Sequence, residues 1–240
     1  TLVDCYSNDI IKDLKGFDAL LWNWYHDDPK ANIFAKQLLK SVEDIGLKVF
    51  PNTNTCFFYD DKIGQKYLLE SINAPFIKTY IFYEENAANT FIESSDYPLV
   101  FKLNRGAGSS NVFLIKSKSE AQKIVRKAFS KGFNAIDRGN LWKDARREFS
   151  HKFCKSNLTK LLKATYRLIF KTEFEKMSPK QKGVVYFQEF IPKNDFDIRI
   201  IVVGNKAFGV RRYCRPNDFR ASGSGRITYE KSELGEECVK

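Results

Sequence analysis

Hydrophobic residues recur at two spacings along this chain of 240 residues, one typical of helices and one typical of strands. Residues 17–24 are mostly apolar and predict a buried strand, and residues 47–51 predict a second short strand that ends at a proline. Between them, residues 29–43 carry apolar side chains three and four positions apart, which predicts a helix. This order predicts a parallel βαβ unit, and therefore an α/β layer at the start of the chain.

The later segments predict a mixed arrangement. A helix is expected to begin at residues 60–62, capped by Asp60 or Asp61, and another is expected over residues 119–129. Residues 79–82 predict a strand. From residue 184 onward the spacing changes to two, and Gly204-Asn205 predicts the turn of a β-hairpin. The expected fold class is therefore α/β, with α+β character in the later part.

Composition excludes several classes of protein. A hydrophobic content of 43% with 15% aromatic residues is enough for a packed core, and the longest apolar runs are too short to span a bilayer. Five scattered cysteines indicate reduced thiols in a cytoplasmic protein rather than a disulfide framework. The sequence has no cluster of His and Cys residues that would predict a metal site. The first residue is Thr1 rather than Met, so we expect the natural start to lie elsewhere.

Positive charge is concentrated in one segment. The chain has a net charge of +11, and residues 131–182 hold fourteen basic and five acidic residues. Apolar residues recur at helical spacing within residues 134–183, so one interpretation is a helical pair with solvated lysines. The other is a surface for an acidic polymer, an anionic membrane or nucleic acid. The helical spacing of its aromatic residues favours a place in the core over base stacking; they are Phe149, Phe153, Tyr166 and Phe170.

A lysine inside an apolar strand is the first candidate for chemistry. Lys102 ends the run Leu99-Val-Phe, where an unpaired ammonium would be costly unless it lies at an edge or binds an anion. The glycine-rich loop that follows, residues 104–110, offers backbone N–H groups and hydroxyls to phosphate oxygens. A glycine-rich hairpin turn with an edge lysine explains the segment equally well.

Two further segments add to this candidate. Residues 186–192 form a strand that ends at a proline, which leaves backbone groups able to meet an adenine edge, and Asp195 and Asp197 follow it. Five arginines then crowd into about twenty residues and would repel one another unless an anion or acids balance them. They are Arg199, Arg211, Arg212, Arg215 and Arg220.

These segments, in this order, resemble the ATP-grasp superfamily, and within it the glutathione-synthetase and RimK-type branch. The motifs that carry the resemblance are Asp61-Lys62, Pro75-x-x-x-Thr79, Pro98-Leu-Val-Phe-Lys102, Gln188-Glu189-Phe190-Ile191, Asp197-Ile-Arg199 and Phe219-Arg220-Ala-Ser222. The resemblance implies an ATP-grasp fold in three parts. They are an N-terminal α/β region (1–59), a central and lid subdomain (60–192) with a basic helical insertion (134–183), and the start of a C-terminal subdomain (193–240).

The resemblance also implies roles for individual residues. ATP would be contacted by Lys62, Lys102, Gly106, Gly108, Ser109, Glu189, Phe190, Ile191, Asp197 and Ser222. The γ-phosphate or the acceptor carboxylate would be contacted by Arg199, Arg212 and Arg220. In this arrangement residues 106–110 form a mobile loop over the phosphates, and residues 189–191 form the adenine hinge. Asp197 holds the ribose, unless the short spacing from Glu189 gives that role to Asp195.

The implied activity is that of an ATP-dependent carboxylate–amine ligase, which passes through an acylphosphate. Its partners would be ATP, a carboxylate acceptor and an amine, with an acidic polymer at residues 131–182 as a further partner and a homo-oligomer as a plausible assembly. The family's Mg²⁺ ligands lie in a later strand pair, which this chain would lack because it ends at Lys240. We therefore expect the magnesium site to be absent and turnover to be lost in this chain. Two alternatives are a non-enzymatic polyanion- or nucleic-acid-binding protein and an ATP-grasp kinase that does not ligate.

Overall fold

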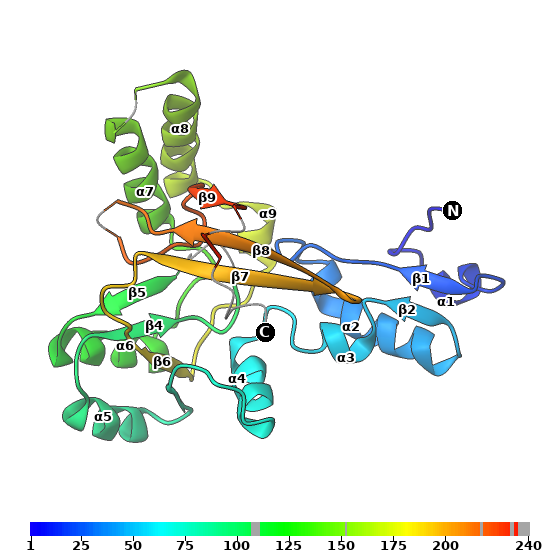
Figure 1. The fold of residues 1–240 in the computed structure, drawn as a ribbon, viewed down its shortest axis with the longest axis horizontal. Coiled ribbons are helices and arrows are strands. Elements are labelled where there is room, and N and C mark those ends of the chain that lie inside the picture. Colours follow the sequence, from blue (N-terminus) through cyan, green and yellow to red (C-terminus); the bar gives the residue numbers. More distant parts are fainter. Residues whose placement is uncertain (107–110, 152, 217, 231–232, 235–240) are drawn as a thin grey trace.

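The computed structural model describes residues 1–106, 111–151, 153–216, 218–230 and 233–234 (Figure 1). The described residues form three sheets, of two, four and three strands. Four of the five cysteines, Cys5, Cys56, Cys154 and Cys214, are free thiols; Cys238 lies outside the described residues. Among the helices of the described residues, none has the length and hydrophobicity that a membrane span requires.

The N-terminal layer contains the predicted parallel βαβ unit. Strands β1 (Ala19–Leu21) and β2 (Lys48–Phe50) pair in parallel, and helix α2 (Ala31–Asp44) connects them. Two short helices, α1 (Ile10–Asp13) and α3 (Thr53–Cys56), flank this unit.

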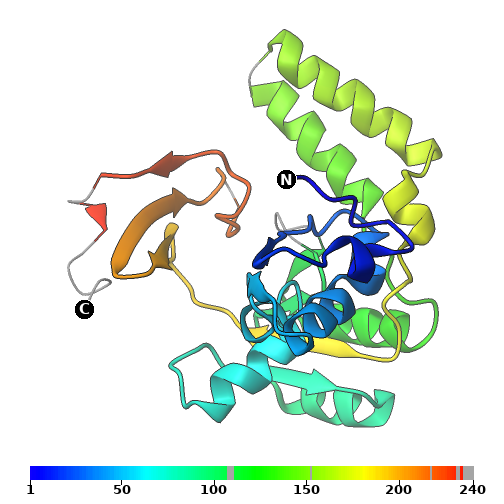
Figure 2. The same ribbon diagram turned by 90° about the vertical axis from the view of Figure 1, so that its right-hand side faces the viewer.

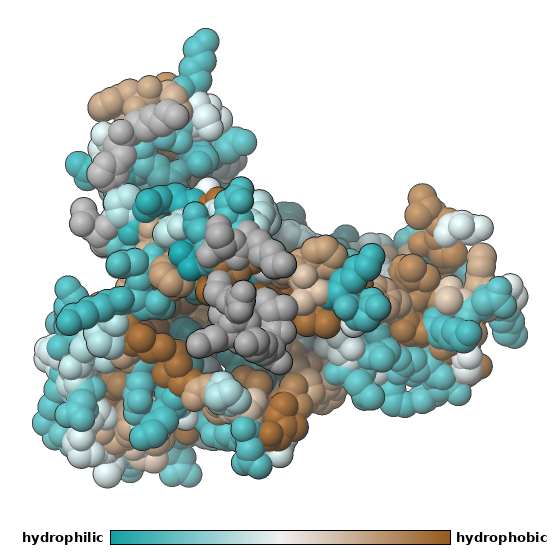
Figure 3. All heavy atoms as spheres, in the orientation of Figure 1, coloured by the Kyte–Doolittle hydropathy of each residue, from teal (hydrophilic) through white to brown (hydrophobic). Residues whose placement is uncertain are grey.

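The prediction that residues 17–24 form a buried strand is wrong. Only three of them pair, and Leu21 and Phe50 are 73% and 70% exposed. Leu20 and Val49 pack against α2, whereas their neighbours in each strand face the opposite side. No described element covers that side, and hydrophobic side chains are visible on this layer at the right of Figure 3.

The second sheet holds the main core. Its strands are β3 (Thr79–Phe82), β6 (Val185–Glu189), β4 (Leu99–Lys102) and β5 (Val112–Ile115), all antiparallel to their neighbours. Helices α5 (Glu85–Ser94) and α6 (Lys118–Phe129) cover one face, where Phe101 and Phe187 are fully buried. Helix α5 was not predicted from the sequence.

Two predicted helix starts in this region are confirmed. Helix α4 (Lys62–Ser71) is capped by Asp61, whose Oδ1 accepts a hydrogen bond from the Gly64 backbone N–H at 2.8 Å. Helix α6 is capped by Ser117, whose hydroxyl accepts from the backbone N–H of Glu120. Each cap satisfies an N–H group that has no partner within its helix.

The basic segment forms helices α7 (Arg138–His151), α8 (Lys155–Ile169) and α9 (Glu173–Met177). The α7–α8 pair projects away from the rest of the chain in both views (Figures 1 and 2). The expectation that its aromatic residues lie in a core is wrong: Phe153, Tyr166 and Phe170 are 79%, 62% and 51% exposed. The pair buries small residues such as Ala145 and Ala164, and its outer side has no described cover.

The third sheet stands apart from the second and joins it through residues 190–195 (Figure 2). It consists of β7 (Phe196–Val203), β8 (Lys206–Tyr213) and β9 (Ile227–Thr228). The predicted hairpin turn is confirmed, with Gly204 at φ +59°, a left-handed conformation that glycine adopts at little cost. The subdomain boundaries at residues 59 and 192 stay predictions.

The paired phenylalanines of the second sheet should dominate its stability. Because Phe101 is fully buried between strands and helices, Phe101→Ala should lower the free energy of unfolding by about 3–5 kcal/mol in urea titrations. The matched control is Ile201→Ala on β7, a residue that is 48% exposed, for which we expect a loss under about 1 kcal/mol. Equal losses at the two positions would contradict this assignment of the core.

Candidate nucleotide-binding site

The candidate site lies on the face of the second sheet that α5 and α6 leave open. Strand pairing sets Lys102 opposite Tyr186 and Val100 opposite Gln188, and Gln188 also lies opposite Thr79. Directly paired residues point to the same side of a sheet, so all five side chains share this face. The core phenylalanines belong to the alternate positions and point to the helices.

Lys102 is held by an amide rather than by an acid. Its Nζ donates to Oε1 of Gln188 at 2.5 Å, and Nε2 of Gln188 donates to the hydroxyl of Thr79 at 3.0 Å. Burial, with a smaller effect of the nearby Lys62 ammonium, lowers the pKa of Lys102 to about 8. No carboxylate in the described chain forms an ion pair with Lys102, so its charge remains uncompensated.

Lys62 is held by the backbone of the loop after β4. Its Nζ donates to the carbonyl oxygens of Asn104 at 3.3 Å and Gly106 at 2.9 Å. Burial lowers the pKa of Lys62, while the carboxylates of Asp60 and Asp61 act in the opposite direction. Asp60 also accepts a hydrogen bond from the Gly106 backbone N–H at 2.8 Å, which fixes the start of the glycine-rich loop.

The ammonium groups of Lys62 and Lys102 are therefore both partly desolvated, and they lie close enough together for Lys62 to lower the pKa of Lys102. An anion between them would relieve this repulsion and favour both charged forms. Phosphate groups have the required charge, and cations arranged in this way stabilise phosphate oxygens. Of the predicted loop residues, Gly106 lies beside Lys62, whereas Gly108 and Ser109 lie outside the described residues.

The predicted adenine hinge follows directly on β6. Glu189 is exposed and accepts a hydrogen bond from the hydroxyl of Tyr80 at 2.9 Å. The ring of Phe190 packs edge-on against Phe219 with 5.9 Å between centroids, and Ile191 is 48% exposed. Glu189 pairs with Leu99, so the predicted hinge begins at the end of the strand that pairs with the strand of Lys102.

In the β7–β8 hairpin, the residue predicted to contact the ribose and one predicted to contact the γ-phosphate or acceptor bind each other. Asp197 lies opposite Arg212 across β7 and β8, and the two form a bidentate ion pair at 2.6 and 2.7 Å. Asp195, the alternative ribose ligand, is exposed beside them. Arg199 is also exposed and forms no ion pair with the described residues.

Acids from two segments balance the remaining arginines. Arg220 pairs with Asp218 at 2.6 Å and with Asp144 of α7 at 3.3 Å, and Arg215 pairs with Asp144 at 3.1 Å. Arg147 of α7 binds both carboxylates. The repulsion expected among the arginines is therefore relieved by acids, one of which lies in the basic segment. Ser222 lies nearby, and its carbonyl oxygen accepts a hydrogen bond from Arg215.

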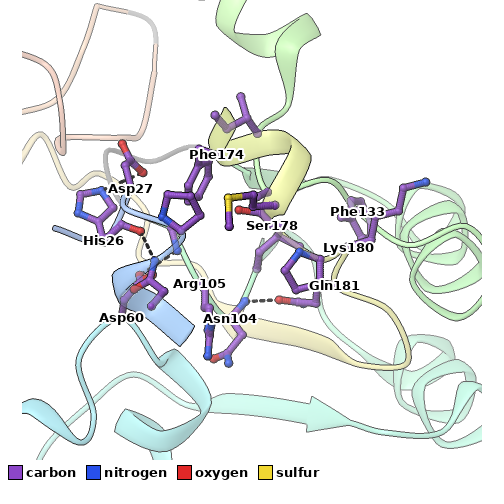
Figure 4. Close-up of a pocket in the computed structure, with 18 of the residues that line it drawn as sticks. His26, Asp27, Asp60, Asn104, Arg105, Phe133, Phe174, Ser178, Lys180 and Gln181 are labelled. Carbon is purple, nitrogen blue, oxygen red and sulfur yellow. Dashed lines mark hydrogen bonds and ion pairs between the residues drawn. The ribbon is translucent and has the colours of Figure 1, made fainter. Parts of the chain in front are cut away.

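A cavity of about 680 Å³ adjoins the loop after β4 and was not anticipated from the sequence (Figure 4). Several segments far apart in the chain meet there, among them residues 26–33, 60–63, 103–106, 133–141 and 174–184. Gln181 lines it, and its Oε1 accepts from the Asn104 backbone N–H at 2.6 Å. Neither Lys62 nor Lys102 lines this cavity, so it lies beside the lysine pair and not between the two ammonium groups.

The described residues offer no donor set for a metal ion. Among them no group of three or more His, Cys, Asp or Glu side chains is placed to hold one.

No family model matches the chain, and no curated protein matches it in sequence. Among solved structures, it is similar to the biotin carboxylase–β,γ-ATP complex from Campylobacter jejuni, with a TM-score of 0.51 and 12% identity over 95% of this chain and 42% of that chain. The fold is similar to that of ATP-grasp enzymes.

Two further structures with the ATP-grasp fold are similar to the chain. One is a RimK domain ATP-grasp protein from Sphaerobacter thermophilus, with a TM-score of 0.43 and 17% identity over 74% of this chain and 50% of that chain. The other is the D-alanine–D-alanine ligase from Helicobacter pylori, with a TM-score of 0.40 and 11% identity over 85% of this chain and 49% of that chain. The chain thus spans half or less of the length of these three ATP-grasp structures.

The pKa of Lys102 gives the ligand-free protein a distinctive pH dependence. The folded state releases this proton at about pH 8 and the unfolded chain at about 10.5, so the unfolded chain holds more protons between these values. The free energy of unfolding therefore rises with pH in this window. Between pH 7 and 9.5 we expect Lys102 to contribute a rise of about 2 kcal/mol, measured by urea unfolding.

Lys102→Met keeps the apolar stem and removes the charge. This variant should be more stable than the parent at pH 7. Its free energy of unfolding should lack the rise with pH that Lys102 contributes. Lys78→Met, at an exposed lysine, should retain the rise. An equal rise in the parent and in Lys102→Met would contradict the assignment.

Proposed function

We propose that this chain binds ATP as part of an ATP-dependent carboxylate–amine ligase that acts through an acylphosphate. The observation that carries the proposal is the pair of half-buried lysines, Lys62 and Lys102, beside the open face of a sheet in an ATP-grasp-like fold. An enzyme that transfers a phosphoryl group depends on positioned cations more than on a protein nucleophile. The lysine pair is an arrangement of this kind.

In this proposal the two lysines contact the phosphates of ATP, and the backbone of residues 189–191 contacts the adenine edge. Asp197 or Asp195 contacts the ribose. Arg199, Arg212 and Arg220 serve the γ-phosphate or the acceptor carboxylate, and Ser222 lies beside them. Arg212 and Arg220 would have to exchange their Asp partners for the ligand, because both are engaged in ion pairs.

The reaction would proceed in two steps. A carboxylate oxygen of the acceptor attacks the γ-phosphorus, the bond to ADP breaks, and an acylphosphate forms. The amine nitrogen then attacks the acyl carbon, inorganic phosphate leaves, and the nitrogen loses a proton to give an amide. The cavity beside the glycine-rich loop has room for a small acceptor with apolar and charged parts, since Phe174, Met177 and Arg105 line it.

Other expectations from the resemblance remain part of this proposal: Mg²⁺ in the complete enzyme, a cytoplasmic location and a homo-oligomer.

Nucleotide-dependent stabilisation tests the binding part of the proposal. ATP at a hundredfold excess over its dissociation constant should add about 2.7 kcal/mol to the free energy of unfolding, measured as a rise in Tm with and without Mg²⁺. Lys102→Met and Lys62→Met should lose this rise, because each removes a phosphate-binding cation. Lys78→Met, which removes an exposed lysine, should keep it. If ATP raised the Tm of both site variants as much as that of the parent, the proposed nucleotide site would be contradicted.

Trapping with hydroxylamine tests the chemical part. Hydroxylamine attacks an acylphosphate at its acyl carbon and gives a hydroxamate, so the complete enzyme with ATP, Mg²⁺ and a panel of carboxylic acids should yield hydroxamate and ADP together. Formation of amide when amines replace hydroxylamine would support a ligase, whereas phosphorylated acceptor without amide would identify a kinase. ATP binding with neither product from any acceptor would leave binding intact and count against the ligase reaction.

A further inference from the structure

The α7–α8 pair carries a second charged surface, separate from the lysine pair of the nucleotide-binding site. A cavity of about 790 Å³ lies along it, lined by both helices and by the loop after β8. Six basic and three acidic side chains line this cavity. Its excess of positive charge favours an anionic occupant.

The acids of this cavity are already engaged. Asp137 accepts a hydrogen bond from the backbone N–H of Asn140, and Glu148 forms an ion pair with Lys160 at 2.8 Å. Asp144 is shared by the arginines of the loop after β8. The acids therefore do not neutralise the other cations of the cavity.

Three cations of the cavity have no partner among the described residues. The side chains of Lys163, Arg167 and Lys171 all line it, and none forms an ion pair or a hydrogen bond with the described part of the chain. Lys163 and Arg167 lie one turn apart on α8, and Lys171 lies just beyond the end of that helix. Like charges at this spacing repel one another, so a row of anionic groups along them would be stabilising.

Two exposed aromatic rings lie beside these cations. Tyr166 and Phe170 line the same cavity and stack with 4.4 Å between centroids and 24° between planes. They are 62% and 51% exposed, and Leu162 beside them is 62% exposed. An aromatic face that no other part of the protein covers can stack on a nucleobase.

We propose that the α7–α8 surface binds single-stranded nucleic acid. The phosphates follow Lys163, Arg167 and Lys171, and bases stack on Tyr166 and Phe170. A single strand fits better than a duplex because the rings need unstacked bases, which a duplex hides. An acidic protein segment would match the charges, but it would leave the stacked rings without a specific partner.

Fluorescence anisotropy with labelled oligo-dT and oligo-rU of twelve nucleotides tests this proposal on the full chain. Single strands should bind more tightly than a duplex of equal length. The triple variant Lys163→Gln, Arg167→Gln, Lys171→Gln should weaken binding and reduce the slope of log K against log salt concentration by about 2, or about 0.7 for each phosphate contact. The double variant Tyr166→Ala, Phe170→Ala should bind about tenfold more weakly with an unchanged slope.

The matched control removes three exposed lysines elsewhere, Lys78→Gln, Lys116→Gln and Lys123→Gln, and should retain both affinity and slope. Lys102→Met should also bind oligonucleotide like the parent, so failure of this surface and failure of the nucleotide site are distinguishable. Far-UV circular dichroism and urea unfolding confirm that each variant folds. Binding of duplex or polyglutamate as tightly as single strands, or full affinity in the aromatic variant, overturns the proposal.

Discussion

Two half-buried ammonium groups lie close together beside the open face of the second sheet, and no carboxylate in the described chain forms an ion pair with Lys102. Lys102 is bound by the amide of Gln188, and Lys62 by two carbonyl oxygens. The amide and carbonyl dipoles satisfy the N–H donors but leave the positive charge in place. An anion at the open face would therefore be stabilised. The carbonyl oxygen of Gly106 and the side chain of Gln188 on β6 supply two of the atoms that bind these ammonium groups.

Much of the fold could be predicted because the signals are local. A carboxylate before the first turn marked the start of α4, a glycine in the left-handed region marked the hairpin turn, and apolar spacing marked α2. The candidate lysines could also be located, since a cation within an apolar strand is unusual in any context. Helix α5 was missed, since its pattern of small and polar residues did not stand out in the sequence.

What could not be predicted depends on contacts between distant segments. Asp144 meets Arg215 across 71 residues, and no local pattern in either segment indicates that pairing. The cavity at the loop after β4 likewise needs several segments far apart in the chain to meet. Amphipathic spacing shows which side of a helix is apolar, but it does not show whether another element covers that side. For this reason Tyr166 and Phe170 were assigned to a core that the structure does not build.

The ion-pair network between α7 and the loop after β8 joins three guanidinium groups to two carboxylates. If Arg220 turned towards an incoming anion, Asp218 would retain Arg147 at 3.3 Å and Asp144 would retain Arg215 at 3.1 Å. Neither acid would become an isolated buried charge, which is the usual obstacle to withdrawing one member of such a network. The network therefore tolerates the departure of Arg220, because Arg147 and Asp144 of the basic helical segment keep the remaining charges paired.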